Sequence, residues 1–460
     1  MLDRIKKNLV VITKVFLGVL LLQFFLQTFV TFRIWRDGTF WTLIWMWKEF
    51  LIVALTIFVI RFLAKRIEKE KIKKMWEDFP LKWFVIVFCL TILVAFVISV
   101  FNSSISNFVL SIRYSMFGYF IFILFYVISY LFFNLKSEKI AERYSKIIKR
   151  VLWCALIRWA IIRLCPAFIE LFGYNRWNYE WKVWEQPPVA YYTQYNDWYV
   201  RNQFLFERPI SLWFFLVAFW PLFFMLVLYK KWTKNRIIRW WLYWIILLST
   251  FSRAARWAWF AQTIILFFAL YRKQNKKLFL SFLIPIICLL WVVTYYWRDQ
   301  IIYRDYSNTG HVKELVVAVN KIKEKPFLGW WAASAGPASH HLGEWQEYNP
   351  ENQYLQIWLE YWLIAFIGRM ALYLYMNFVG FKTLKKDYMD EKSSKEIKNL
   401  SLIIFAFSLW MIGLSIEWLV LHSFVDRMIV YPFTALFGIY LATYYRAKLN
   451  WTENKKALYQ

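Results

Sequence analysis

Apolar positions along this chain form long blocks separated by short, charged gaps. Each block holds roughly 20 residues, the length that an α-helix needs to cross the hydrocarbon core of a bilayer. The polar interruption TFSRAAR divides the apolar run between 237 and 271 into two helices. We therefore expect an all-α integral membrane protein with about twelve transmembrane helices. Their predicted residues are 8–32, 40–60, 83–101, 107–135, 151–173, 210–229, 237–251, 254–271, 278–297, 353–380, 400–423 and 428–445.

Composition and charge agree with a membrane protein and predict its orientation. Hydrophobic residues make up 60% of the chain and the mean hydropathy is +0.40, whereas soluble domains are roughly 45–50% apolar. The positive-inside rule assigns gaps rich in Lys and Arg to the cytoplasm, together with both termini, so the net charge of +28 reflects topology. These basic gaps lie at 61–82, 136–150, 230–239, 272–277 and 382–398, and both tails are basic as well.

The remaining long gaps are expected outside, and they divide the chain into five parts. Residues 1–173 hold the first five predicted helices, 210–297 hold the next four, and 353–460 hold the last three with the cytoplasmic tail. The two long external loops are 174–209 and 298–352. The first block is too long for a signal peptide and lacks a small-residue cleavage site, so we expect it to remain as a span.

Several classes of function lack their sequence signals. The chain contains no GxxxxGK[ST], GxGxxG or HExxH motif, which excludes the usual nucleotide and zinc-hydrolase signatures. Cys89, Cys154, Cys165 and Cys288 fall inside predicted helices, with no spacing typical of a metal site or a disulfide framework. The basic runs only flank predicted helices, which argues against a nucleic-acid-binding module. We expect neither a metal nor a cofactor.

The two external loops carry the residues that can do chemistry. Loop 174–209 is dense in Trp, Tyr, Asn and Gln, which suits either stacking on sugar rings or an aromatic belt at the lipid headgroups. In loop 298–352, HVKELVVAVNKIKEK predicts an amphipathic helix between Gly310 and Pro326, resting on the membrane surface or on the bundle. Its predicted apolar face is Val312, Leu315, Val316, Val319 and Ile322. The following GWWAASAGPAS supplies small residues for a close backbone approach.

Four segments together resemble the O-antigen ligase and O-antigen polymerase superfamily. They are RNQFLFERPISLWFFLVAFWPL, the turn TFSRAAR, PFLGWWAASAGPAS after the amphipathic helix, and ENQYLQIWLEYWLIAFIG at the next span. The motifs cover about residues 195 to 375, and the rest of the chain resembles the family only in topology.

The resemblance implies a fold and an activity. Family members are polytopic C-type glycosyltransferases of bacterial cytoplasmic membranes that serve lipopolysaccharide and surface polysaccharide biosynthesis in the cell envelope. At the external face they move a glycan from an undecaprenyl diphosphate carrier to an acceptor, without a nucleotide sugar or a metal. The acceptor is a lipid A core sugar in ligases and another carrier-linked glycan in polymerases.

Three arginines match or neighbour family positions that bind the diphosphate. Arg253 matches the arginine of the SR turn, Arg256 lies one helical turn further, and Arg201 matches the arginine before the span at 210–229. A guanidinium is always protonated and offers a bidentate fork to phosphate oxygens, which suits a site without a metal. The alternative is that these arginines snorkel to the interface or face solvent.

The candidate base departs from the family pattern. Glu351 stands where the family usually has a histidine, and His311 stands where it usually has an arginine. Either Glu351 takes the proton of the acceptor hydroxyl and a protonated His311 assists as a diphosphate ligand, or Glu351 orients His311 as the base. An acid at a helix N-terminus is also favoured by the macrodipole without any catalytic role. Asn352 and Gln356 keep family-like identities and are expected to contact sugar or phosphate.

Some alternatives stay open on sequence alone. The adjacent His340 and His341 are rivals for the role of base, although histidine pairs in loops are often only solvated. Trp362 occupies a position where the family helix usually has a glycine, so it either fills a gap between helices or narrows the lipid groove.

A transporter is the alternative from another class, because ionisable residues inside spans often mark transport paths. Arg113, Arg158, Arg163 and Glu417 lie within predicted spans, but no internal repeat is visible in the sequence.

Overall fold

The computed structural model describes most of the central and C-terminal chain. Besides isolated positions at 11, 291, 295 and between 150 and 164, the described residues are 47–66, 69–132, 192–194, 199–201, 209–224, 234–250, 252–270, 305–341, 348–419 and 427–457. The predicted spans at 8–32, 151–173 and 278–297 lie almost wholly outside these residues. So does most of the first external loop.

The described part is helical apart from one short hairpin, in which β1 (Tyr192–Gln194) pairs antiparallel with β2 (Tyr199–Arg201). The helices before the hairpin are α3 (Trp47–Arg66), α4 (Lys69–Asp78), α5 (Lys82–Asn102), α6 (Ile105–Ser115) and α7 (Phe117–Phe132). Those that follow it are α10 (Pro209–Phe223), α11 (Lys234–Ser249), α12 (Arg253–Leu270), α15 (Asp305–Glu324), η3 (Gly336–His341), α16 (Gln353–Thr383), η5 (Leu384–Tyr388), α17 (Lys395–Glu417) and α18 (Arg427–Ala457).

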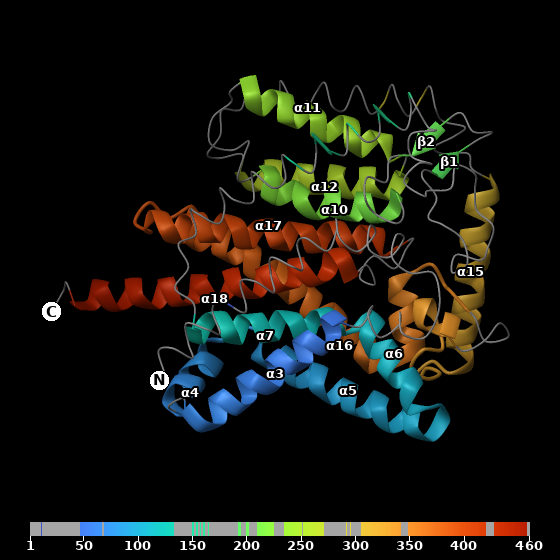
Figure 1. Cartoon of the computed structure of the whole chain (residues 1–460), viewed down its shortest axis with the longest axis horizontal. Helices are drawn as coiled ribbons and strands as arrows, with labels where there is room; N and C mark the ends of the chain where they lie inside the picture. Colours follow the sequence, from blue (N-terminus) through green and yellow to red (C-terminus); the bar gives the residue numbers. More distant parts are fainter. Residues whose placement is uncertain are drawn as a thin grey trace.

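Most of these helices run side by side in a stack, and α15 stands across one end of it (Figure 1). The order in this view is α11, then α12 and α10, then α17, α18 and α7, with α3 and α5 on the opposite side. Helix α17 packs against α10, α12, α16 and α18, and α18 also packs closely along α7. The stack therefore has α17 and α18 at its centre.

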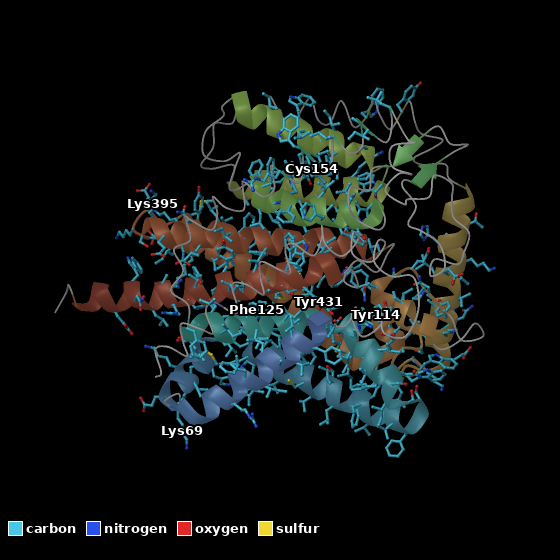
Figure 2. All side chains as sticks on the ribbon, in the orientation of Figure 1. Lys69, Tyr114, Phe125, Cys154, Lys395 and Tyr431 are labelled. Atoms are coloured by element: carbon cyan, nitrogen blue, oxygen red, sulfur yellow. The ribbon has the colours of Figure 1, made fainter. Side chains whose placement is uncertain are left out.

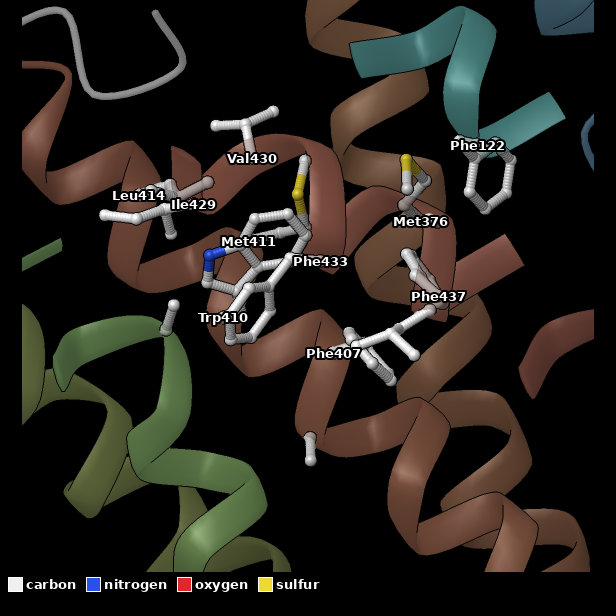
Figure 3. Close-up of a cluster of buried hydrophobic side chains, with 14 of the residues drawn as sticks. Phe122, Met376, Phe407, Trp410, Met411, Leu414, Ile429, Val430, Phe433 and Phe437 are labelled. Carbon is white, nitrogen blue, oxygen red and sulfur yellow. The ribbon is translucent and has the colours of Figure 1, made fainter. Parts of the chain in front are cut away.

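The core is apolar and rich in aromatic side chains. Figure 3 shows α17 side chains meeting α18, with Phe122 of α7 and Met376 of α16 beside them. The ring of Phe407 stacks on Phe437 with centroids 5.2 Å apart, and Trp410 lies 4.9 Å from Phe433. Such pairs add about 0.5–1.5 kcal/mol each beyond the burial of their area.

Three of the described helices are long and apolar enough to cross a membrane. They are α5, α16 extended through η5, and α17. Taken together, α6 and α7 are also long and apolar enough to cross a membrane, although the pair is bent by 63° at the break. Helix α5 exposes Leu90, Leu93 and Phe101 at 55%, 58% and 82%. A surface this apolar is suited to lipid rather than to water.

The structure corrects several predicted boundaries. The span predicted at 107–135 is two helices, because the chain bends at Met116. The helix predicted at 428–445 continues to Ala457, since the polar residues after 445 include neither Pro nor Gly. Helix α4 forms inside the basic gap 61–82, where only a loop was expected.

The amphipathic helix also differs from its prediction. Helix α15 begins at Asp305, so Gly310 lies inside it rather than at its start. Its predicted single apolar face is divided in two. Val312, Val316 and Val319 are exposed, whereas Ile322 packs inward with Ala318, which the prediction had left out.

Basic segments gather at the end of the stack opposite α15. Figure 2 labels Lys69 at the start of α4 and Lys395 at the start of α17, and both lie toward the end where α18 finishes. At that end, Lys448 of α18 forms an ion pair with Asp387 of η5, with 2.8 Å between Nζ and Oδ1. Lys69 and Lys395 thus lie at one end of the bundle, and α15 with the loop after it lies at the other.

Candidate functional site

The candidate site is built around α15, the loop that follows it, and the first turns of α16. A small hydrophobic cluster joins them, formed by Ala318 and Ile322 of α15, Ala335 and Tyr348 of the loop, and Leu359 of α16. The cluster holds α15 on the bundle through residues that lie three to four positions apart on one face.

Backbone contacts fix the start of the loop against α16. Trp330 donates its backbone N–H to the carbonyl of Leu359 at 2.8 Å, and Trp358 donates its indole N–H to the carbonyl of Pro326 at 2.8 Å. Gly329 has a φ of +60°, and a Cβ there would lie 2.6 Å from the Leu359 oxygen. Only glycine allows this approach, as expected from the small residues of GWWAASAGPAS.

The middle of the loop is closed by a second set of bonds. Gly336 donates its N–H to the carbonyl of Tyr348 at 2.8 Å, and the Ser339 hydroxyl accepts the N–H of Tyr348 at 3.0 Å. The Tyr348 hydroxyl donates to the carbonyl of Glu314 at 2.8 Å, which ties the loop back to α15. Burial raises the pKa of the Tyr348 phenol, and the nearby Glu314 raises it further.

Lys321 of α15 and Lys325, just after that helix, lie over the rings of Tyr348 and Trp330. The Lys321 ammonium is 4.1 Å from the centroid of Tyr348, and that of Lys325 is 4.4 Å from the centroid of Trp330. Burial lowers the pKa of Lys321, while Glu324 and Glu314 raise it in part. The ammonium groups are held by aromatic faces, which attract cations through the ring quadrupole.

The two residues considered for the base are in direct contact. His311 of α15 presents Nδ1 to Oε2 of Glu351, and both side chains are about one-third exposed, at 30% and 36%. Glu351 has a φ of +48°, an uncommon conformation for a residue with a Cβ. Its backbone N–H donates to Asn349 Oδ1 at 3.3 Å. The strained backbone turns the carboxylate toward α15.

Asn352 caps α16 and joins it to α17. Its Oδ1 accepts the N–H of Leu355 at 3.0 Å, and its Nδ2 donates to the carbonyl of Leu419 at 3.0 Å. The backbone N–H of Gln353 donates to the carbonyl of Trp418 at 3.0 Å. These bonds satisfy free groups at the ends of both helices. The capping is therefore done by Asn352, which leaves the Glu351 carboxylate to His311.

Gln356 points away from the surface. It is fully buried, its Nε2 donates to Glu360 Oε2 at 3.3 Å, and its Oε1 accepts from Gln353 at 3.4 Å. The α-carbon of Gly336 lies close to the Gln356 side-chain amide. A Cβ at Gly336 would lie 2.4 Å from Gln356 Cδ. The amide links the loop to a polar cluster inside the bundle.

That inner cluster was not predicted as part of a site. Glu360 accepts hydrogen bonds from Ser111 and Ser115 of α6 at 3.2 and 3.3 Å, and the Tyr361 hydroxyl bonds to Ser111. Arg369 lies nearby, over the ring of Tyr361. The available signal was the presence of two charged residues, Glu360 and Arg369, inside an apolar block.

The predicted diphosphate residues are described to different extents. Arg253 is the first residue of α12 and Arg201 ends β2, but the side chains of both lie outside the described part. Ser252 precedes Arg253 and accepts the N–H of Ala255 at 3.2 Å, so it starts α12. Arg256 is 9% exposed. His340 ends η3 with its neighbour His341, and their side chains are likewise outside the described part.

Comparison with known proteins adds no relative: no family model, curated protein or solved structure matches the chain. Among the described residues, no group of three or more His, Cys, Asp or Glu side chains is arranged to hold a metal ion.

Proposed function

We propose that this chain is an O-antigen ligase-like glycosyltransferase that moves a glycan from undecaprenyl diphosphate to an acceptor. The observation that carries the proposal is the contact between His311 and Glu351. It joins a helix of the second long loop to the mouth of α16, which are the two segments where the motifs suggested a base. Both side chains are about one-third exposed, so a substrate can reach them.

The contact favours a histidine base oriented by a carboxylate. In this proposal the nearby Glu351 carboxylate favours the tautomer with the proton on Nδ1, which leaves Nε2 to accept a proton. The acceptor hydroxyl gives its proton to Nε2 while its oxygen forms a bond to the anomeric carbon of the donor. The bond from that carbon to the carrier diphosphate breaks, and its electron pair leaves with the phosphate oxygen.

The leaving diphosphate needs positive charge. In this proposal Arg253, Arg256 and Arg201 supply it, since guanidinium groups form bidentate hydrogen bonds to phosphate oxygens. Asn352 caps α16 and Gln356 supports the loop, and their expected contacts with sugar or phosphate stay a prediction.

The cellular setting belongs to the same proposal. A twelve-span protein of the bacterial cytoplasmic membrane, with both termini in the cytoplasm, has the loop 298–352 outside, where carrier-linked glycans are joined. The position of α15 at the end of the bundle opposite Lys69 and Lys395 supports this orientation (Figure 2). A transporter would need ionisable groups along a path through two related halves.

The test measures glycan transfer by the purified protein from a carrier-linked donor. Glu351→Gln keeps the shape of the side chain but not its charge, so we expect transfer to fall by about a hundredfold or more. His311→Ala is expected to lose as much, and the double variant no more than His311→Ala, because the two residues act as one unit. Gly310→Ala, next to His311 with nothing within 4 Å of the added Cβ, is the matched control.

The acceptor offered decides between the alternatives. Transfer to a lipid A core sugar identifies a ligase, and transfer to a second carrier-linked glycan identifies a polymerase. Normal transfer by Glu351→Gln together with an inactive His311→Ala would mean that His311 works without the carboxylate. Normal transfer by both variants would remove this pair from the mechanism, and movement of the donor across the membrane without any transfer would identify a transporter.

A further inference from the structure

Helix α16 is interrupted one third of the way along its length. Trp362 has φ 73° and ψ 169°, a conformation found almost only for glycine. On an unbroken helix Glu360 and Arg369, nine residues apart, would point about 180° away from each other. In the structure the guanidinium of Arg369 lies 4.9 Å from the ring centroid of Tyr361, the neighbour of Glu360. The break brings both charges to one side.

Both side chains belong to one buried polar cluster. Glu360 is 1% exposed and Arg369 is 5% exposed. Ser111 and Ser115 of α6 donate to Glu360, and the ring of Tyr119 lies 5.8 Å from the Arg369 guanidinium carbon. Gln356 joins the cluster from the side of the loop.

Glu360 and Arg369 each keep one unpartnered edge. All three hydrogen bonds to Glu360 go to Oε2, and no donor among the described residues reaches Oε1. Likewise, no described acceptor reaches Nε or Nη2 of Arg369, which form one fork of the guanidinium. The two side chains do not form an ion pair with each other within 4.0 Å.

We propose that the polar cluster at the break in α16 binds water, which bridges Glu360 Oε1 to the Nε and Nη2 fork of Arg369. A buried polar atom without a hydrogen-bond partner is strongly destabilising. Water supplies the donor that Glu360 Oε1 lacks and the acceptor that Arg369 Nε and Nη2 lack, because each molecule donates two hydrogen bonds and accepts two. The water site is independent of the transferase activity.

Hydrogen-bonding capacity selects water over apolar occupants. A carboxyl oxygen that lacks a donor and a guanidinium edge that lacks acceptors need a partner that can both donate and accept. A small neutral molecule with both donors and acceptors is the best match. Water bound at the break hydrates the polar groups inside a membrane-crossing helix.

The experiment uses thiol chemistry as a probe of hydration. In a full-length chain whose four native cysteines are replaced, Ser115→Cys places a thiol in the polar cluster, where Ser115 donates to Glu360. Ser408→Cys places a control thiol on α17, where Ser408 is fully buried and donates to the carbonyl of Met376 at 3.0 Å. Membranes are treated with methyl methanethiosulfonate, a small uncharged reagent that also enters lipid. It reacts with the thiolate, which forms only where water or a positive charge stabilises it.

We expect Ser115→Cys to react about tenfold or more faster than Ser408→Cys. If Ser115→Cys and Ser408→Cys react equally slowly, the proposal is wrong. Size-exclusion chromatography shows whether each variant folds. If Ser115→Cys does not fold, Ser111→Cys replaces it as the probe. If Ser408→Cys does not fold, Ser99→Cys replaces it as the control. Ser99 is fully buried on α5.

Two further arms separate water from its alternatives. Adding Glu360→Leu and Arg369→Leu to the Ser115→Cys chain removes both charges, so the rate should fall to that of the control. A rate that stays high would show that the charge pair does not hold the water. Exchanging chloride for gluconate should leave the rate unchanged, and a rate that depends on chloride would identify an anion as the occupant.

Discussion

Gly336→Ala is expected to destabilise the protein through two measurable effects. Gly336 has a φ of +70°, and holding a residue with a Cβ in this left-handed conformation costs about 1–2 kcal/mol. The new Cβ would lie 2.4 Å from Cδ and Nε2 of Gln356, so the amide must move by about 1 Å to reach an ordinary contact distance.

Moving the amide disturbs a buried hydrogen bond. Gln356 Nε2 donates to Glu360 Oε2 at 3.3 Å, and losing this bond inside the bundle costs about 1–3 kcal/mol. The two effects together lower the free energy of unfolding by about 2–5 kcal/mol, a large share of the roughly 5–15 kcal/mol typical of a folded domain.

Thermal unfolding in detergent, followed by tryptophan fluorescence, measures the change. Gly310→Ala is the control, because Gly310 lies inside α15 and an added Cβ meets nothing within 4 Å. There the substitution should stabilise the helix by about 0.5–1 kcal/mol. Equal unfolding temperatures for Gly336→Ala and the unsubstituted protein would refute the argument, since they would show that the loop relaxes without cost.

Three other outcomes are expected. Trp362→Gly should be more stable than Trp362→Ala by about 1–2 kcal/mol in detergent unfolding, the reverse of the usual helix order, because only glycine adopts φ 73° freely; the usual order would mean that the break straightens. Asn352→Ala should lower stability by about 1–2 kcal/mol, and Asn352→Ser, which keeps the cap, should lose less; equal losses would show that the cap contributes little. Arg253→Lys should lower glycan transfer by about a hundredfold at unchanged expression, since an ammonium cannot replace a bidentate fork; normal transfer would make Arg253 structural.

The sequence predicted helices well where the apolar blocks have sharp ends. Helix α5 was expected at 83–101 and runs from Lys82 to Asn102, because hydropathy and helix end together at that point. The bend at Met116 was missed since both sides of it are apolar and no proline marks it. The end of α18 was missed because the helix continues beyond its apolar block into polar residues.

In the candidate site, residues that are distant in sequence lie close together in the structure. The possibility that Glu351 orients His311 was raised from the motifs, and the structure brings the two side chains together across forty residues of chain. The cluster of Glu360 and Arg369 was missed because a helical period predicts opposite faces for positions nine apart. Only the backbone of Trp362 reverses that expectation, and no propensity scale assigns such a conformation to tryptophan.

The break at Trp362 also divides α16 into two mechanical units. The outer segment is tied to the loop through Leu359 and Trp358 and to the end of α17 through Asn352. The inner segment is locked to α17 where Gly380 meets Ser408. Since no regular helix joins the two, fluctuations that open one need not open the other. The segment of α16 before the break, α15 and the described residues of the loop between them are thus linked to one another by contacts that do not involve the segment after the break.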